Sequence, residues 1–106
     1  MYHDFSGNPK YVDRANAMLT DGEQLIAIVD TEQRVISVTS ERVILHEKRS
    51  GGYSAIRNSQ ISAIEVSNAH GEEKFVKILF GGAYERTIGA PDAAQAAVIA
   101  GAASRG

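Results

Sequence analysis

Short segments rich in β-branched residues alternate with compact polar turns through the middle of the chain. Four of them lie between residues 34 and 68, at 34–38, 42–46, 53–57 and 60–66. Apolar runs of about five or six residues joined by short loops are typical of an antiparallel meander. The pattern therefore predicts four consecutive antiparallel strands. In the fourth, the uneven spacing of Ile61, Ile64 and Val66 indicates a bulge near Ser62–Ala63.

Three more segments extend this meander to seven strands. Residues 24–29 are apolar on both alternating faces, with Ile26 and Ile28 on one of them and Leu25, Ala27 and Val29 on the other. Such a strand needs cover on both sides, by the core on one and by another element or subunit on the other. Residues 74–80 and 84–88 are the last two strands, joined at Gly81–Gly82. Along residues 74–80, Phe75, Lys77 and Leu79 form a mixed face that we expect to be partly exposed.

A helix is predicted on each side of the strands. Asn8 suits an N-cap and Pro9 the first helical position, with Tyr11, Ala15, Met18 and Leu19 recurring on one face until Asp21–Gly22. Residues 1–8 are predicted to be a flexible lead-in. After Pro91, an alanine-rich helix spans 92–103, with small residues in a stripe: Ala94, Ala97, Val98 and Gly101. We expect this second helix to lie across the mouth of the strands.

Size and charge narrow the class of protein. The chain has 106 residues, no cysteine and 43% hydrophobic residues, which predicts one domain over 9–106 without disulfides or thiolate metal sites. Eleven basic residues against thirteen acidic ones give a net charge of −2. This balance disfavours binding to nucleic acid or to an anionic membrane. With neither an apolar span nor a signal-like N-terminus, the expected location is cytoplasmic.

Seven strands followed by one C-terminal helix is the element order of a pleckstrin-homology-like (PH-like) barrel. Three local patterns agree with it: Leu19-x-x-Gly22-Glu23-x-Leu25, Val38-Thr39-x-x-Arg42-Val43-Ile44-Leu45 and Ile56-x-x-x-x-Ile61-x-x-Ile64-Glu65-Val66. Together these resemble the bacterial PH-like domains over about residues 9–103. The resemblance implies a mainly β fold, a barrel of seven antiparallel strands with an N-terminal helix and a C-terminal capping helix. It also implies a non-catalytic module and assembly into symmetric rings.

The recognisable polar positions have roles in making the fold. Thr39 precedes a tight turn, where its hydroxyl can bond to nearby backbone groups. Arg42 opens the next strand and could pair with either Glu41 or Glu23. Many PH domains bind phosphoinositides with a basic first hairpin loop, but here that loop, residues 30–34, carries two carboxylates and one guanidinium. Like charge would repel an anionic headgroup there.

One basic cluster remains as a candidate ligand site. Lys48, Arg49 and Arg57 lie on the arms of the third predicted hairpin, with Tyr53 between them. These four residues could bind a small anionic ligand or a lipid headgroup. Alternatively, the charges serve only to keep an exposed hairpin tip in water.

No pattern in the sequence points to catalysis. His3, His46 and His70 lack metal-ligand spacing, and neither a phosphate-binding loop nor a dinucleotide fingerprint occurs. Serine, histidine and aspartate show no spacing that indicates a triad. We therefore expect neither an enzyme nor a bound metal or cofactor.

With catalysis and metal binding set aside, the function that we expect is contact with other proteins. The simplest partner is another copy of the same chain. A PH-like barrel has exposed strand edges, which natural proteins cover or pair. Tyr11, Ile28, Phe75 and Leu79 are the predicted interface residues, because they lie on the outer faces of the predicted elements. The alternative is a monomer in which the N-terminal helix alone covers the outer apolar face.

Overall fold

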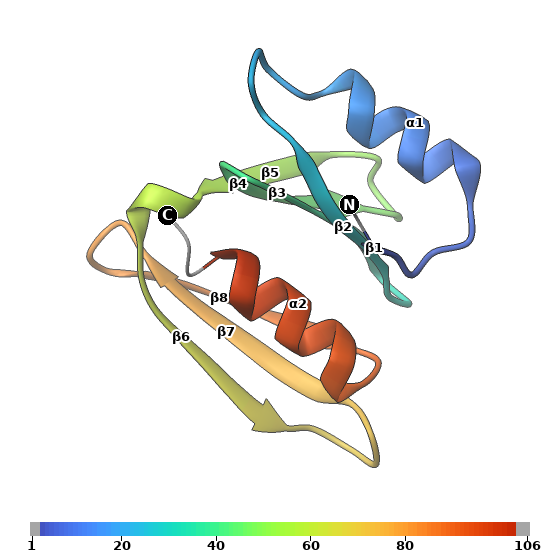
Figure 1. The fold of residues 1–106 in the computed structure, drawn as a ribbon. Helices are drawn as coiled ribbons and strands as arrows, with labels where there is room; N and C mark the ends of the chain where they lie inside the picture. Colours follow the sequence, from blue (N-terminus) through green and yellow to red (C-terminus); the bar gives the residue numbers. More distant parts are fainter. Residues whose placement is uncertain (1–2, 104–106) are drawn as a thin grey trace.

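Two β-sheets pack against each other, one helix covers the outer face of the first sheet, and a second helix lies between the sheets (Figure 1). The computed structural model describes residues 3–103, and the side chains of residues 3–101. Residues 1–2 and 104–106, which belong to the predicted lead-in and to the end of the predicted domain, lie outside the described residues.

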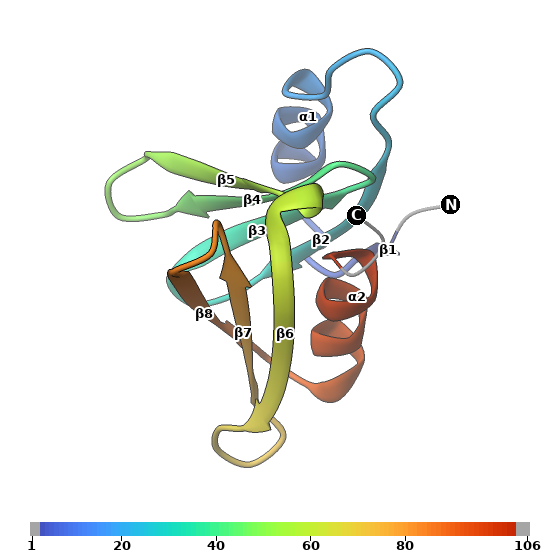
Figure 2. The same ribbon diagram turned by 90° about the vertical axis from the view of Figure 1, so that its left-hand side faces the viewer.

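The five-stranded sheet has the order β1-β2-β3-β4-β5, and the three-stranded sheet has the order β6-β7-β8. The strands are β1 (His3–Asp4), β2 (Leu25–Asp30), β3 (Arg34–Thr39), β4 (Arg42–Glu47), β5 (Tyr53–Arg57), β6 (Ile61–Asn68), β7 (Lys74–Phe80) and β8 (Tyr84–Ala90). A short 3-10 helix, η1 (Asn58–Gln60), joins the two sheets. The seven predicted strands are therefore confirmed as β2–β8. Within the described residues the two sheets share no strand pairing, so the PH-like barrel is open between them, with the exposed strand edges expected from the sequence (Figure 2).

The predicted lead-in contains a strand that the sequence did not reveal. His3 and Asp4 pair in parallel with Ala27 and Ile28 of β2, and Phe5 N donates to Ile28 O at 2.9 Å. A strand of two residues is too short to show an alternation of apolar and polar positions. Because β1 pairs in parallel with β2, no hairpin turn in the sequence marks it either. The pairing satisfies part of the outer edge of β2.

Two irregularities shift which residues face the core. The register between β6 and β7 shifts between Ile61 and Ala63, which confirms the predicted bulge. A second shift between Leu25 and Ala27 was not predicted. Because of it, Ile26 packs against the main core and Leu25 against the outer cluster, so the expected assignment of these two residues to faces was wrong.

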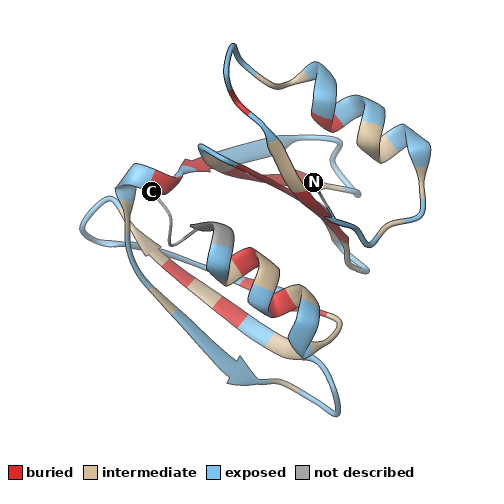
Figure 3. Cartoon of the chain, in the orientation of Figure 1, coloured by how far each residue is buried: buried red, intermediate tan, exposed pale blue. Residues whose placement is uncertain are grey.

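The main core lies between the two sheets and includes α2 (Ala93–Ala103). Its fully buried side chains come mainly from β3, β4, β7 and β8, among them Ile36, Leu45, Ile78 and Ile88 (Figure 3). From α2, Ala96 and Ile99 are the buried members, whereas Ala94, Ala97 and Gly101 are exposed. The predicted small-residue stripe was therefore placed on the wrong face, because alanine lies all round this helix and gives no amphipathic signal.

The outer cover predicted for β2 is α1 (Pro9–Ala17), whose buried Ala15 contacts the fully buried Ile28 and Val35. Tyr11 and Val12 pack beside them. The predicted cap is confirmed, because Asn8 Oδ1 accepts a hydrogen bond from Lys10 N at 3.0 Å. The helix ends four residues before the predicted stop at Asp21. The chain's own helix thus accounts for the apolar outer face of β2.

Candidate functional site

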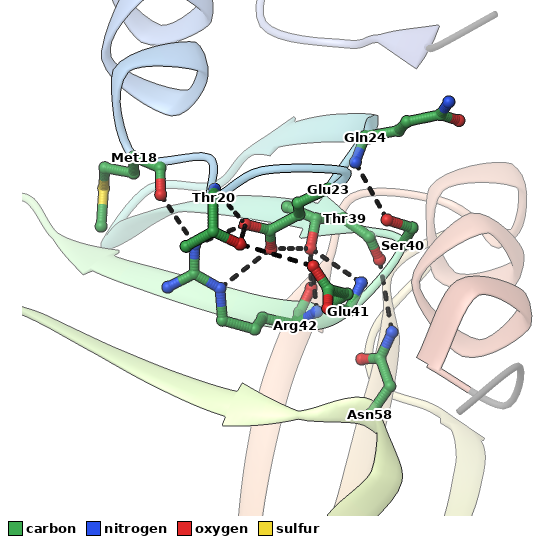
Figure 4. A network of polar contacts seen from close by, with 9 residues as sticks. All are labelled: Met18, Thr20, Glu23, Gln24, Thr39, Ser40, Glu41, Arg42 and Asn58. Atoms are coloured by element: carbon green, nitrogen blue, oxygen red, sulfur yellow. Dashed lines mark hydrogen bonds and ion pairs between the residues drawn. The ribbon is translucent and has the colours of Figure 1, made fainter.

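A buried ion pair ties the corner after α1 to the start of β4. Arg42 Nε donates to Glu23 Oε2 at 2.9 Å and Arg42 Nη2 to Glu23 Oε1 at 2.7 Å, a two-pronged contact (Figure 4). Arg42 Nη2 also donates to Met18 O at 2.8 Å. Of the two carboxylates that the sequence offered to Arg42, the structure selects Glu23.

Thr39 completes this network from the end of β3. Its hydroxyl donates to Glu23 Oε2 and accepts from the backbone nitrogens of Glu41 and Arg42, at 3.1 and 2.8 Å. The predicted turn role of Thr39 is confirmed. The hydrogen bonds from Arg42, Thr39 and the Thr20 backbone outweigh burial and lower the pKa of Glu23 from 4.5 to about 2. Both carboxylate oxygens of Glu23, the Thr39 hydroxyl and two nitrogens of the Arg42 guanidinium are thus engaged within the fold, so the network acts as a structural link between these segments.

The predicted basic cluster is divided by the fold. Lys48 Nζ lies 2.6 Å from Asp30 Oδ1 and donates to Thr31 O at 2.7 Å, so this cation is bound to the first hairpin loop. Arg57 lies at the far end of β5 from Tyr53, roughly 13 Å along a strand at about 3.3 Å per residue. Arg49 stays at the exposed tip without an ion pair to the described residues. Anion binding by this tip stays a prediction.

Tyr53 is 61% exposed, and its ring lies 5.5 Å from the ring of His46, measured between centroids. His46 is buried, and burial, with a smaller contribution from the charge of Arg14, lowers the pKa of its imidazole. Arg14 in turn lies over the Tyr11 ring, at 5.3 Å from its centroid. The charge of Arg14 on α1 therefore reaches the imidazole of His46 on β4 and disfavours its protonation.

The four predicted interface residues differ in exposure. Ile28 is fully buried under α1 and is not available to another protein. Tyr11 is half-buried in the same cluster. Phe75 remains 45% exposed, and Leu79 is half-buried. The mixed outer face of β7 thus exists as predicted, whereas the face of Ile28 is internal.

The outer edge of β5 is the longest uncovered run of the first sheet. Glu47 N donates to Gly52 O and Asn58 N to Glu41 O, at 2.8 Å each. Because hydrogen-bonded positions alternate along an antiparallel strand, Ser54 and Ile56 direct their backbone groups toward β4. The backbone N–H and C=O groups of Tyr53, Ala55 and Arg57 therefore point away from the sheet. No further strand of residues 3–103 pairs with them.

Two clefts lie at opposite ends of the sandwich. The loop cleft, about 390 Å³, is lined mainly by the β2–β3 loop, the β6–β7 turn and the end of β8. The polar cleft, about 370 Å³, lies where the β3–β4 turn meets η1. It is lined by Thr20, Ser40, Glu41, Arg42, Arg57, Asn58 and Ser59. The sequence did not indicate this cleft, because it depends on the register that places Arg57 opposite Arg42.

Neither a metal site nor a membrane span emerges from the part of the chain that the structure describes. Its histidine, aspartate and glutamate side chains form no group of three that could hold a metal ion. Neither described helix has the length and hydropathy needed to cross a bilayer.

Comparison with solved structures identifies the fold. A DUF1696 family protein with a pleckstrin-homology domain, from Shewanella loihica PV-4, superposes with a TM-score of 0.63 at 18% identity, covering 77% of this chain and 79% of that one. A pleckstrin homology domain from Shewanella amazonensis SB2B gives 0.63 at 19% identity, covering 82% of this chain and 77% of that one. The chain has a PH-like fold. No family model and no curated protein matches the sequence.

Within this PH-like fold, the first hairpin loop keeps the charge expected from the sequence. Asp30 and Glu32 both line the loop cleft, and Lys48 is paired to Asp30. Arg34 is paired with Glu47 at 3.3 Å. At this end the domain's own carboxylates thus pair with Lys48 and Arg34, whereas Lys74 donates to the amide oxygen of Asn68.

Proposed function

We propose that this PH-like domain is a non-catalytic contact module that associates with copies of itself through the open edge of β5. The observation that carries the proposal is the row of outward backbone donors and acceptors on Tyr53, Ala55 and Arg57. An edge of this kind is a template for pairing with another strand.

β5 has few of the features that usually prevent a strand edge from pairing with another chain. The strand contains no proline, its pairing with β4 has no bulge, and α1 covers β2 and β3 instead. A single charge, on Arg57, stands at its end. With Tyr53 exposed at the other end, this edge can add a neighbouring strand without displacing any part of the domain.

The partner edge determines the shape of the assembly. Pairing of β5 with β5 of a second copy has twofold symmetry and ends at a dimer. Pairing of β5 with a different edge of the next copy repeats from copy to copy and forms a ring when the rotation between copies closes. β8 provides such an edge, since residues 84–87 are exposed and β8 is last in its sheet. Two unlike open edges on one chain support the ring-like form.

The test is the mass of the assembly, measured by light scattering behind size exclusion. We expect a multiple of the chain mass that persists at moderate salt, because backbone hydrogen bonds between neutral groups are weakly screened. Ala55→Pro removes one outward N–H while leaving the hydrogen bonds to β4, and we expect it to yield monomer. Ala55→Val keeps that N–H and is the matched control. A monomeric wild-type chain, or an Ala55→Pro assembly of unchanged mass, would refute the proposal.

A further inference from the structure

The polar cleft contains a buried acceptor without a donor. Asn58 is 3% exposed; its Nδ2 donates to Thr39 O at 3.3 Å, and its backbone N donates to Glu41 O. Its Oδ1 has no hydrogen-bond partner among the described residues. In Figure 4 this oxygen lies on the side of the amide that faces Glu41 and Arg42. A buried acceptor left unpaired is unfavourable, so the position favours a ligand that brings an N–H or O–H group.

The same cleft carries a cation without a carboxylate partner. Arg57 stands directly across from Arg42 in the β4–β5 pairing. Arg42 is neutralised by Glu23, whereas Arg57 makes no ion pair with any of residues 3–101. Arg57 is therefore the cation of this cleft that can pair with an anionic group of a ligand.

A carboxylate of the cleft is also weakly engaged. Glu41 Oε2 accepts a long hydrogen bond, 3.5 Å, from Thr20 Oγ1. The guanidinium of Arg42 makes its short contacts with Glu23, not with Glu41. The cleft therefore offers a free cation, a weakly engaged anion and a buried acceptor close to one another, lined also by the hydroxyls of Ser40 and Ser59.

We propose that the polar cleft binds a small zwitterion of the α-amino acid class. The ligand's carboxylate lies on Arg57, and its ammonium group donates to Asn58 Oδ1 and to Glu41. A simple anion would leave Asn58 Oδ1 unpaired and would face the charge of Glu41. A nucleobase would lack an aromatic platform, because the residues lining the cleft include none. The volume, about 370 Å³, is at the small end of the range for ligand sites.

The experiment is an NMR titration of the full, isotopically labelled chain with glycine and L-glutamine. We expect saturable shifts centred on the backbone amides of Ser40, Glu41, Asn58 and Ser59. Acetate and methylammonium, which each carry one of the two charges, should bind at least about tenfold more weakly, since each loses one charge-assisted contact. Absence of saturable shifts, or equal binding of acetate and the amino acids, would overturn the proposal.

Variants locate the site. Arg57→Ala and Glu41→Gln alter exposed side chains, and each should weaken amino acid binding about tenfold or more. Arg49→Ala removes an exposed cation at the other end of the hairpin and should leave the affinity unchanged. Truncation of the buried Asn58 would endanger folding, so the test rests on the two exposed positions. Ala55→Pro should retain amino acid binding, which separates this inference from the proposed self-association.

Discussion

Arg42 and Glu23, nineteen residues apart, meet through both oxygens of the carboxylate, at 2.9 and 2.7 Å. The Glu23 side chain is fully inaccessible to solvent, and that of Arg42 is 21% exposed. Since Glu23 precedes β2 and Arg42 opens β4, the pair fixes two ends of the first sheet to each other. A buried pair with this geometry destabilises the fold strongly when one partner is lost.

The first prediction concerns acid stability. The pKa of Glu23 is about 2 in the folded chain against an ordinary value of 4.5. Because the folded value is the lower one, the stabilisation is complete above about pH 4.5 and declines as the pH falls toward 2. The shift corresponds to about 3 kcal/mol. Urea unfolding from neutral pH down to about pH 3 should show this loss in the wild type and much less of it in Glu23→Gln. Equal acid slopes in the two chains would contradict the assignment.

The second prediction concerns the cation of the pair. Arg42→Ala leaves the carboxylate of Glu23 buried without its charge partner, so we expect a loss of roughly 3–5 kcal/mol in the free energy of unfolding. Arg34→Ala is the matched control, because Arg34 pairs with the partly exposed Glu47 at 3.3 Å. Because the Glu47 carboxylate keeps contact with water, whereas that of Glu23 has none, we expect the loss in Arg34→Ala to be smaller, about 1 kcal/mol. Similar losses in both variants, by chemical denaturation, would show that Glu23 relaxes toward solvent.

The third prediction separates packing from association at Ile28. Its side chain is fully buried between α1 and the first sheet, so Ile28→Ala should cost roughly 2–5 kcal/mol through a cavity. Phe75→Ala, on the exposed outer face of β7, should cost much less. We expect the Ile28→Ala chain, where folded, to keep the wild-type assembly mass in light scattering. A lower mass with unchanged stability would place Ile28 at an interface.

The fourth prediction concerns His46. Burial, and then the charge of Arg14, lowers its pKa from 6.5 in the folded chain. Because the folded value is below the unfolded one, protonation opposes folding, and stability rises with pH through the window just below 6.5. An NMR titration of the imidazole should therefore give a midpoint below 6.5. Arg14→Gln should move this midpoint upward but not fully to 6.5, since burial remains. An unshifted midpoint in the wild type would show that the ring is open to water.

Much of the fold could be predicted from the sequence, because its signals are local. Alternating apolar residues placed β2–β8 within one or two residues of their ends, and uneven spacing at Ile61 and Ile64 located a bulge. Asn8 and Pro9 marked the start of α1. Each of these features depends only on residues a few positions apart, so it can be read from the sequence.

The candidate site could be predicted less well, because it depends on which residues of neighbouring strands pair with each other. Arg57 was grouped with Lys48 and Arg49 by its place in the sequence, but strand length separates them, and pairing sets Arg57 against Arg42. Lys48 bears a charge that the sequence shows, yet only the packed loops reveal that Asp30 neutralises it. Asn58 lies in the short loop between the predicted strands 53–57 and 60–66, where its residue type carries no signal of a binding site.

By itself, the sequence determined the order of the elements, their approximate ends and the absence of a thiol or a recognisable catalytic pattern, since period and composition are properties of the chain alone. Only the tertiary structure decided that α1 covers Ile28, that β1 joins β2 in parallel, and that Glu23 takes Arg42. Each of these is a contact between segments far apart in the chain. Such contacts form because apolar faces and buried charges need partners. The sequence alone is compatible with several partners for each of them, and only the packing of the whole chain selects one.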